Sequence, residues 1–134
     1  MSPLVGLVVV SHSREVATGT AAMTRAMVPR VRVVPAGGIA DGELGTDAVA
    51  IAAAIREADT GSGVVVLVDL GSAVLAASTA LELLEDAAAD VRLSGGPLVE
   101  GAVIGAVEAS IGRSVDEVLA ATEAARDLPK VLQR

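Results

Sequence analysis

The sequence contains no cysteine, phenylalanine, tyrosine or tryptophan, and His12 is its single histidine among 134 residues. Without cysteine, disulfide bonds, thiolate catalysis and cysteine-ligated metal sites are excluded. Without aromatic rings, the side chains that most proteins stack on unpaired nucleic-acid bases are missing. One histidine and no cysteine also leave too few of the usual ligands for a structural zinc ion. We therefore expect no bound metal.

Positive charge is scarce as well. Ten basic residues stand against 17 acidic ones, which gives a net charge of −7, and Lys130 is the only lysine. A negative net charge opposes binding to nucleic acid and to anionic membrane surfaces. It is compatible with docking onto a basic protein.

Motifs for nucleotides and membranes are missing too. The chain has neither the Gly-x-x-x-x-Gly-Lys of a P-loop nor a Gly-x-Gly-x-x-Gly after its first apolar run. A phosphate-accepting group on this chain would therefore take its phosphate from another molecule and pass it on. No apolar run approaches the ~20 residues that span a bilayer, and no basic leader precedes the first run. We expect a soluble, cytoplasmic, single domain over residues 1–134.

Short runs of β-branched residues alternate with alanine-rich helical stretches. Strands are expected at 4–10, 32–34, 64–68 and 90–93, and helices at 14–28, 48–58, 71–84, 100–111 and 114–126. Ser114 and Glu117 form a capping-box pattern at the start of the last helix. The alternation predicts βαβ units, and so a three-layer α/β fold. Its open, mostly parallel sheet has four or five strands, with helices on both faces.

The spacing of apolar residues predicts which side of each helix packs on the sheet. In the helix at 48–58, Ala48, Ile51, Ile55 and Ala58 share one side. In the first helix, the corresponding residues are Val16, Met23 and Met27, with Thr20 between them. In the third helix, they are Val74, Ala77, Leu81 and Leu84.

The most reactive residue types come after the expected strands. His12, Gly37-Gly38, Asp69 to Ser72 and Gly95 to Pro97 each begin within three residues of the end of one of them. In open parallel sheets, sites form beyond the carboxyl ends of the strands. These residues are therefore expected at one edge of the sheet.

His12 is the leading candidate for chemistry. It lies between the first strand and the first helix, where a helix N-terminus offers unpaired N–H groups and partial positive charge to a phosphoryl group. Its imidazole, with an unperturbed pKa of about 6.5, is a usable nucleophile at cellular pH. The simpler explanation is a loop histidine satisfied by local hydrogen bonds.

Asp69 comes directly after the strongly apolar run at 64–68. If that strand neighbours the first one, Asp69 lies beside His12. A carboxylate there would hold the ring in one tautomer and leave the other nitrogen free to attack. The alternative is a carboxylate that caps the next helix.

Small residues nearby are candidate supports for a phosphate group. Glycine lets the backbone approach a phosphate closely, and a hydroxyl can donate to a phosphate oxygen. Each also has a plain structural explanation as a turn or a helix cap, such as Thr46 capping the helix at 48–58. The acids Asp41, Glu43 and Asp47 are interpreted as a solvated loop, with a cation site as the alternative. The candidate supports are Ser11, Ser13, Gly38, Thr46, Gly71 and Ser72.

Several motifs, in this order and at these distances, resemble one known family. They are Val-Val-Val-Ser-His-Ser (8–13), Ala-Gly-Gly (36–38), Asp-Gly (41–42), Gly-Thr (45–46), Val-Leu-Val-Asp-Leu-Gly-Ser-Ala (66–73), Pro-Leu-Val-Glu-Gly-Ala (97–102) and Val-Glu-Ala-Ser (107–110). The pattern resembles the DhaM family, the phosphotransferase subunits of bacterial phosphoenolpyruvate-dependent dihydroxyacetone kinases. Their domain is of the mannose-type IIA class of the sugar phosphotransferase system (PTS). The resemblance covers nearly the whole chain.

The resemblance implies a phosphocarrier. His12 matches the phosphorylated histidine of the family and Asp69 the carboxylate that orients it, while Ile39 stands where the family often has Thr or Ser. The implied donor is the phosphohistidine of HPr, charged by enzyme I, with both expected as separate proteins. The implied acceptor is ADP on the DhaL subunit, and DhaK receives the phosphoryl group for dihydroxyacetone. A homodimer with no directly bound cofactor is also implied.

Three alternatives use the same residues differently. A mannose-type IIA domain for sugar transport would pass the phosphate from His12 to a IIB domain, although such relatives tend to have Gly-Gly-Ser after the acid, where this chain has Leu-Gly-Ser-Ala. A small tetrapyrrole metal chelatase also places a histidine after its first strand, but generally needs a second one. A response-regulator receiver would be phosphorylated on Asp69, but wants an acidic pair at the position of Ser11 to Ser13.

Overall fold

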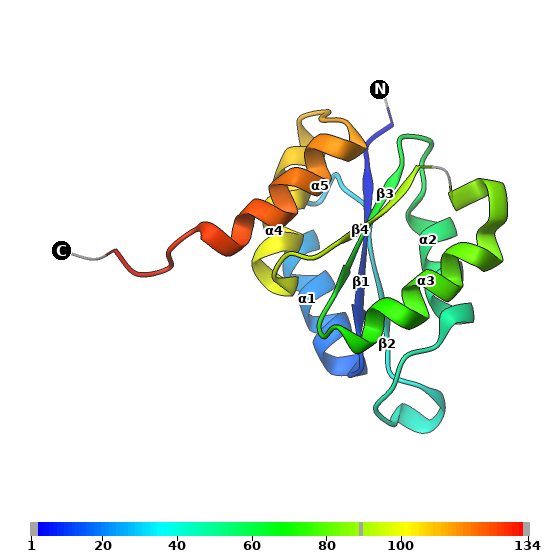
Figure 1. The fold of residues 1–134 in the computed structure, drawn as a ribbon. Helices are drawn as coiled ribbons and strands as arrows, with labels where there is room; N and C mark the ends of the chain where they lie inside the picture. Colours follow the sequence, from blue (N-terminus) through cyan, green and yellow to red (C-terminus); the bar gives the residue numbers. More distant parts are fainter. Residues whose placement is uncertain (1–2, 89, 133–134) are drawn as a thin grey trace.

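The computed structural model describes residues 3–88 and 90–132. In this part of the chain, four parallel strands form one sheet in the order β2-β1-β3-β4 (Figure 1). The strands are β1 (Gly6–Ser11), β2 (Val33–Gly37), β3 (Val64–Val68) and β4 (Val91–Ser94). The predicted α/β fold is thus confirmed, with four strands and all of them parallel.

Five α-helices cover the two faces of the sheet. They are α1 (Arg14–Met27), α2 (Ala48–Ala58), α3 (Ser72–Leu84), α4 (Leu98–Ser110) and α5 (Val115–Ala124). Short 3-10 turns lie at η1 (Ala40–Gly42), η2 (Glu85–Ala88) and η3 (Ala125–Asp127). Figure 1 shows α1, α4 and α5 on one side of the sheet and α2 and α3 on the other. None of the described helices is long and apolar enough to cross a lipid bilayer.

The central strand β1 is buried along its whole length, as its unbroken apolar run predicts. Successive side chains point to opposite faces, so that Val8 and Val10 join the core under α2 and α3. Leu7 and Val9 join the second core, under α1, α4 and α5. β1 therefore connects the two cores, and its carboxyl end is held between β2 and β3.

The predicted inner sides of two helices are wrong in part. Val16, Met23 and Met27 of α1 and Val74 of α3 are exposed. The buried residues are small instead: Ala17, Thr20, Ala21 and Thr24 in α1, and Ala73, Ala77 and Ala80 with Leu84 in α3. The cause is close packing, since a methyl group on Gly37 of β2 would lie 2.7 Å from the Cβ of Ala17. At this distance from the sheet only small side chains fit.

The helix ends are set by local hydrogen bonds. The capping box at Ser114 is confirmed, because its hydroxyl accepts from Glu117 N while the Glu117 carboxylate accepts from Ser114 N. The predicted cap of α2 by Thr46 is wrong. Asp47 takes that position, and its Oδ1 accepts from the backbone nitrogens of Val49 and Ala50 at 2.9 and 3.5 Å. A carboxylate at this end also suits the helix dipole.

Candidate functional site

The strand order places His12 and Asp69 side by side. β1 pairs with β3 in a register that aligns Val10 with Val68. The Asp69 backbone N–H continues the ladder by donating to the Val10 carbonyl at 3.1 Å. The residues that come after the two strands therefore meet at the carboxyl edge of the sheet.

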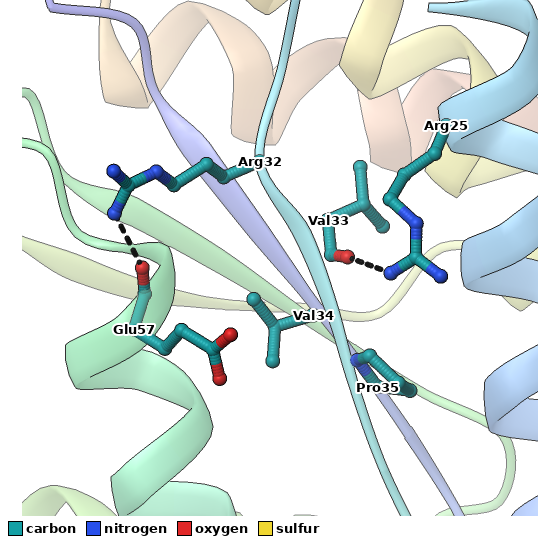
Figure 2. Close-up of a pocket in the computed structure, with 6 residues that line it drawn as sticks. All are labelled: Arg25, Arg32, Val33, Val34, Pro35 and Glu57. Carbon is teal, nitrogen blue, oxygen red and sulfur yellow. Dashed lines mark hydrogen bonds between the residues drawn. The ribbon is translucent and has the colours of Figure 1, made fainter. Parts of the chain in front are cut away.

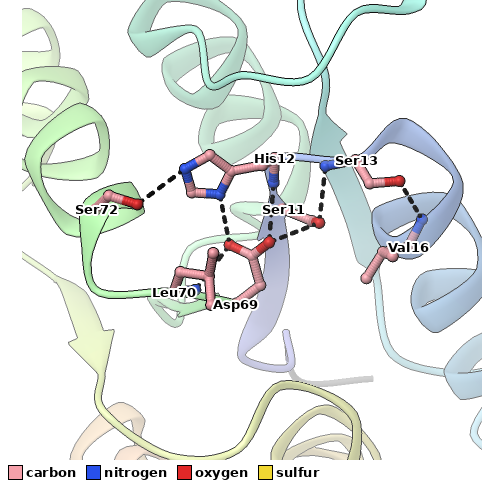
Figure 3. A network of polar contacts seen from close by, with 7 residues as sticks. All are labelled: Ser11, His12, Ser13, Val16, Asp69, Leu70 and Ser72. Carbon is pink, nitrogen blue, oxygen red and sulfur yellow. Dashed lines mark hydrogen bonds and ion pairs between the residues drawn. The ribbon is translucent and has the colours of Figure 1, made fainter.

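The Asp69 carboxylate binds both the side chain and the backbone of His12 (Figure 3). Its Oδ1 lies 3.0 Å from the imidazole Nδ1 and accepts from the Leu70 N–H at 2.8 Å. Its Oδ2 accepts from the His12 N–H at 3.0 Å and from the Ser11 hydroxyl at 2.9 Å. Both side chains are partly buried, with 26% of His12 and 18% of Asp69 exposed. The carboxylate is thus fixed by four donors at once.

These contacts act on the pKa of Asp69 in opposite directions. Burial raises the pKa, but the hydrogen bonds from the His12 backbone and ring, the Ser11 hydroxyl and the Leu70 N–H outweigh it and leave the pKa below its ordinary value. Asp69 is therefore ionised at neutral pH and acts as an acceptor. The Nδ1 of His12 then carries the ring proton, and Nε2 carries the lone pair.

Ser72 lies on the other side of the imidazole. Its hydroxyl oxygen is 3.0 Å from Nε2, so with the proton on Nδ1 the hydroxyl donates to Nε2. Ser72 begins α3, whose N-cap position is Gly71, and no side chain caps this end. In this first turn, the Ala73 N–H donates to the Leu70 carbonyl at 3.0 Å and the Val74 N–H to the Gly71 carbonyl at 3.1 Å, so tight backbone turns close the end, and its partial positive charge lies near Nε2. A methyl group on Gly71 would meet nothing within 4 Å, so the space beside it is open.

The two serines that flank His12 have different structural roles. Ser13 caps α1 by accepting from Val16 N at 3.3 Å, and its hydroxyl donates to Glu15. Ser11 is fully buried, donates to Asp69 and accepts from Ser13 N at 3.0 Å. Ser11 therefore belongs to the network that holds Asp69, whereas Ser13 is accounted for by capping.

The loop 38–47 is tied to the backbone of the site. Gly38, at a φ of 74°, donates to the Ser11 carbonyl at 3.3 Å. Gly45 donates to the His12 carbonyl at 2.9 Å. Gly45 is not among the candidate supports, since nothing in a lone loop glycine indicates which carbonyl it will meet. For Thr46, the structure gives no hydrogen bond to any other candidate among the described residues.

One hollow in the surface lies away from His12. It has a volume of about 600 Å³ and lies along β2, lined by Arg25, Arg32, Val33, Val34, Pro35 and Glu57 (Figure 2). Both guanidinium groups there already donate to backbone carbonyls, Arg25 to Val33 at 2.7 Å and Arg32 to Glu57 at 3.0 Å. Within the described residues, no three or more His, Asp or Glu side chains come together as a metal site. The chemistry is therefore concentrated at His12.

The chain matches known proteins over most of its length. The EIIA-man family model, described as "PTS system fructose IIA component", matches residues 6–119. The DhaM phosphoryl donor subunit of the PEP-dependent dihydroxyacetone kinase of Escherichia coli K12 is 41% identical over 121 residues, covering 87% of this chain and 26% of that protein. The DhaM subunit of kinase 2 of Listeria innocua is 36% identical over 118 residues, covering 87% of this chain and 94% of that one.

Solved structures share the fold. A protein of unknown function, EF1359, has a TM-score of 0.81 at 32% identity, with 91% of this chain and 95% of that one covered. A sigma-54 interaction domain protein from Enterococcus faecalis has a TM-score of 0.70 at 14% identity, which supports the fold alone. The chain spans about a quarter of the E. coli relative, but nearly all of the Listeria one. With its fold and these matches, the chain belongs to the EIIA-man family, and the relatives that it matches over most of its own length are DhaM subunits.

Proposed function

We propose that this chain is a single phosphohistidine carrier domain of a PEP-dependent dihydroxyacetone kinase. His12 accepts a phosphoryl group from phospho-HPr and passes it to ADP held by DhaL, and the ATP so formed phosphorylates dihydroxyacetone on DhaK. The names of the DhaM relatives support the kinase, and the family match supports the carrier chemistry. We further propose that it works in the cytoplasm as a homodimer and binds no cofactor directly.

One observation carries the proposal: Asp69 and Ser72 hold opposite nitrogens of the His12 ring, each at 3.0 Å. Because Nδ1 donates a hydrogen bond to the ionised Asp69, Nε2 carries the lone pair and is the nucleophile. Ser72 has to release Nε2 before the attack, and its hydroxyl is then within reach of an incoming phosphoryl oxygen. We therefore propose Nε2 as the phosphorylated atom.

In the first transfer, the Nε2 lone pair attacks the phosphorus of phospho-HPr. The Nε2–P bond forms while the N–P bond to the HPr imidazole breaks, and no water or metal of this chain takes part. The His12 ring gains positive charge, which the ionised Asp69 stabilises. The partial positive charge at the N-terminus of α3 stabilises the phosphoryl oxygens further.

In the second transfer, a terminal phosphate oxygen of ADP on DhaL attacks the same phosphorus. The Nε2–P bond breaks, and His12 returns to the neutral ring with its proton on Nδ1. Such a transfer mainly requires that the reacting groups are positioned and that the developing charge is stabilised. The residues at the carboxyl edge of the sheet provide both.

The second candidate function is a IIA domain of a sugar-transport PTS, which would use the same His12 chemistry but deliver the phosphate to a IIB domain. This second function is kept because the matching family is described as a fructose IIA component. Family membership speaks against the chelatase and receiver interpretations.

Intact mass spectrometry of the purified chain tests the proposal. The chain is incubated with phosphoenolpyruvate, enzyme I and HPr, and is weighed before and after DhaL and ADP are added. Gain of one phosphate, and then its loss with formation of ATP, is the expected result. A phosphate that DhaL–ADP cannot remove but a IIB domain can would establish the sugar-transport function. No gain of phosphate would overturn the carrier function altogether.

A further inference from the structure

Three leucines beside His12 point into solvent rather than into the protein. Leu44, Leu70 and Leu75 are 74%, 59% and 78% exposed. They come from three different segments: the loop 38–47, the turn after β3 and the first turn of α3. None of them belongs to either hydrophobic core. Their contribution to the stability of the fold is therefore small, and their exposure calls for another explanation.

Each leucine is, or lies within three residues of, a residue that bonds to His12 or Asp69. Leu44 precedes Gly45, whose N–H donates to the His12 carbonyl at 2.9 Å. Leu70 comes directly after Asp69 and donates its own N–H to that carboxylate. Leu75 lies one helical turn after Ser72, the residue in contact with Nε2. We call Leu44, Leu70 and Leu75 the leucine collar.

The charges around the collar are divided between two sides. The loop 38–47 carries Asp41, Glu43 and Asp47 and no basic residue, and all three acids are exposed. On the other side, α3 has no charged residue in its sequence before Glu82. Arg14 and Glu15, at the start of α1, add one exposed charge of each sign beside the site. The collar is thus bordered by an acidic segment, which we call the acidic loop, and by an uncharged helix.

Such a surface fits a protein with a particular face. Clustered exposed leucines mark a contact surface, because burying them in a partner removes apolar area from water. The acidic loop attracts basic side chains and repels negative ones. An acceptor that presents a nucleoside diphosphate brings several negative charges to this edge. A phosphohistidine donor brings one phosphoryl group, so it is the occupant that the charges favour.

On this basis, and resting on the proposed function, we propose that the leucine collar and the acidic loop form the docking surface for the protein that donates the phosphoryl group. The donor meets the collar with an apolar patch beside its phosphohistidine and meets the acidic loop with basic residues. The collar supplies affinity, and the loop steers the encounter.

Steady-state phosphorylation with HPr as the varied substrate tests this surface. Leu75→Gln is compared with Leu83→Gln, a matched change at the far end of the same helix, where Leu83 is also exposed. Glu43→Lys is compared with Glu82→Lys in the same way. Leu75→Gln is expected to raise the KM for phospho-HPr about tenfold at an unchanged maximal rate. Glu43→Lys is expected to raise it about threefold at low salt and to lose this effect at high salt.

The outcomes separate this proposal from the proposed function. If the wild-type chain accepts phosphate but Leu75→Gln and Glu43→Lys keep its KM, the docking surface is wrong and the carrier function stands. Equal effects at Leu83 and Glu82, or a larger effect on transfer to DhaL–ADP than on transfer from HPr, also overturn it. If the wild-type chain takes no phosphate from HPr, both proposals fail together.

Discussion

Two regions at the carboxyl edge of the sheet carry polar residues with opposite results. At the ends of β1 and β3, a serine, a histidine and an aspartate form a network in which, among the described residues, Nε2 of His12 meets only the exposed Ser72 hydroxyl. After β4, Ser94 precedes Gly95-Gly96-Pro97, which the sequence also places at the candidate edge. There the Ser94 hydroxyl pairs with the buried Thr122 hydroxyl at 2.8 Å and accepts from Gly96 N at 3.0 Å.

The difference comes from the later elements of the chain. The end of β4 is covered by Thr122 and Glu123 of α5, so closely that a methyl group on Gly96 would lie 2.1 Å from the Thr122 carbonyl oxygen. Its polar groups satisfy one another within the protein. No such cover lies over Nε2 of His12 in the described part of the chain. A polar strand end becomes a reactive site only where no later element closes it.

The largest expected effect comes from removing the reactive atom at the open end. His12→Gln should abolish phosphorylation completely, while the fold persists because His12 belongs to neither core. Mass spectrometry after incubation with phospho-HPr measures the first effect, and thermal unfolding measures the second. A phosphorylated His12→Gln variant would show that the phosphate sits elsewhere.

Removing the charge that orients the ring should be nearly as severe. Asp69→Asn keeps the shape of the side chain but no longer stabilises a positively charged imidazole. We expect phosphoryl transfer to slow by on the order of 10²–10⁴, with the domain still folded. Single-turnover transfer from phospho-HPr measures the rate. Wild-type rates in this variant would remove Asp69 from the mechanism.

A pair of glycine substitutions sharpens the contrast between the open and the closed end. Gly96→Ala pushes a methyl group against the Thr122 backbone and should cost about 1–3 kcal/mol of unfolding free energy. Gly71→Ala enters open space at a helical φ of −57° and should change stability by less than about 1 kcal/mol. Urea denaturation of both variants gives the comparison. Loss of phosphorylation in a stable Gly71→Ala variant would show that the phosphate needs that space.

The smallest expected effect is a loss of folding stability at acidic pH. Because the folded-state pKa of Asp69 is lowered, its ionised form adds stability above its ordinary pKa of about 3.9. This contribution is lost as the pH falls through the lowered value. We expect the wild-type chain to lose more stability than Asp69→Asn on acidification through that range. Parallel denaturant titrations at several pH values measure the difference, and equal slopes would mean that the hydrogen bonds do not favour the charged form.

The sequence is most informative where one physical effect dominates. The buried strand β3 is an uninterrupted run of valine and leucine, and it matches its predicted range of 64–68 in full. β2 extends to Gly37, beyond its predicted range of 32–34, because Pro35-Ala36-Gly37 has no strand-like pattern of its own. The proximity of His12 and Asp69 is a consequence of that order of strands. The inner sides of α1 and α3 are harder to predict, because hydrophobicity ranks valine and methionine above alanine. Close helix–sheet packing selects alanine instead, as at Ala17 and Ala77.

The rest of the site depends on contacts between distant segments. The Gly45 bond to the His12 carbonyl and the gathering of the leucine collar both arise from how the loop 38–47 folds back onto β1. Ile39 at this loop packs close to Gly45, where a methyl group would lie 2.9 Å from its side chain. Such contacts have no local pattern in the sequence. Only the choice of Asp47 over Thr46 as a cap could have been anticipated, since a carboxylate is the stronger acceptor.

The hollow along β2 bears on how this protein behaves at high concentration. An edge strand is a template for pairing with other chains, because its outer amides and carbonyls are unpaired. Here the Val33 carbonyl is already taken by Arg25, and Pro35 has no N–H to donate. A strand from another chain would thus meet the Arg25 side chain at the Val33 carbonyl and would find no backbone donor at Pro35. The arginine and the proline together protect this edge from intermolecular β-sheet growth.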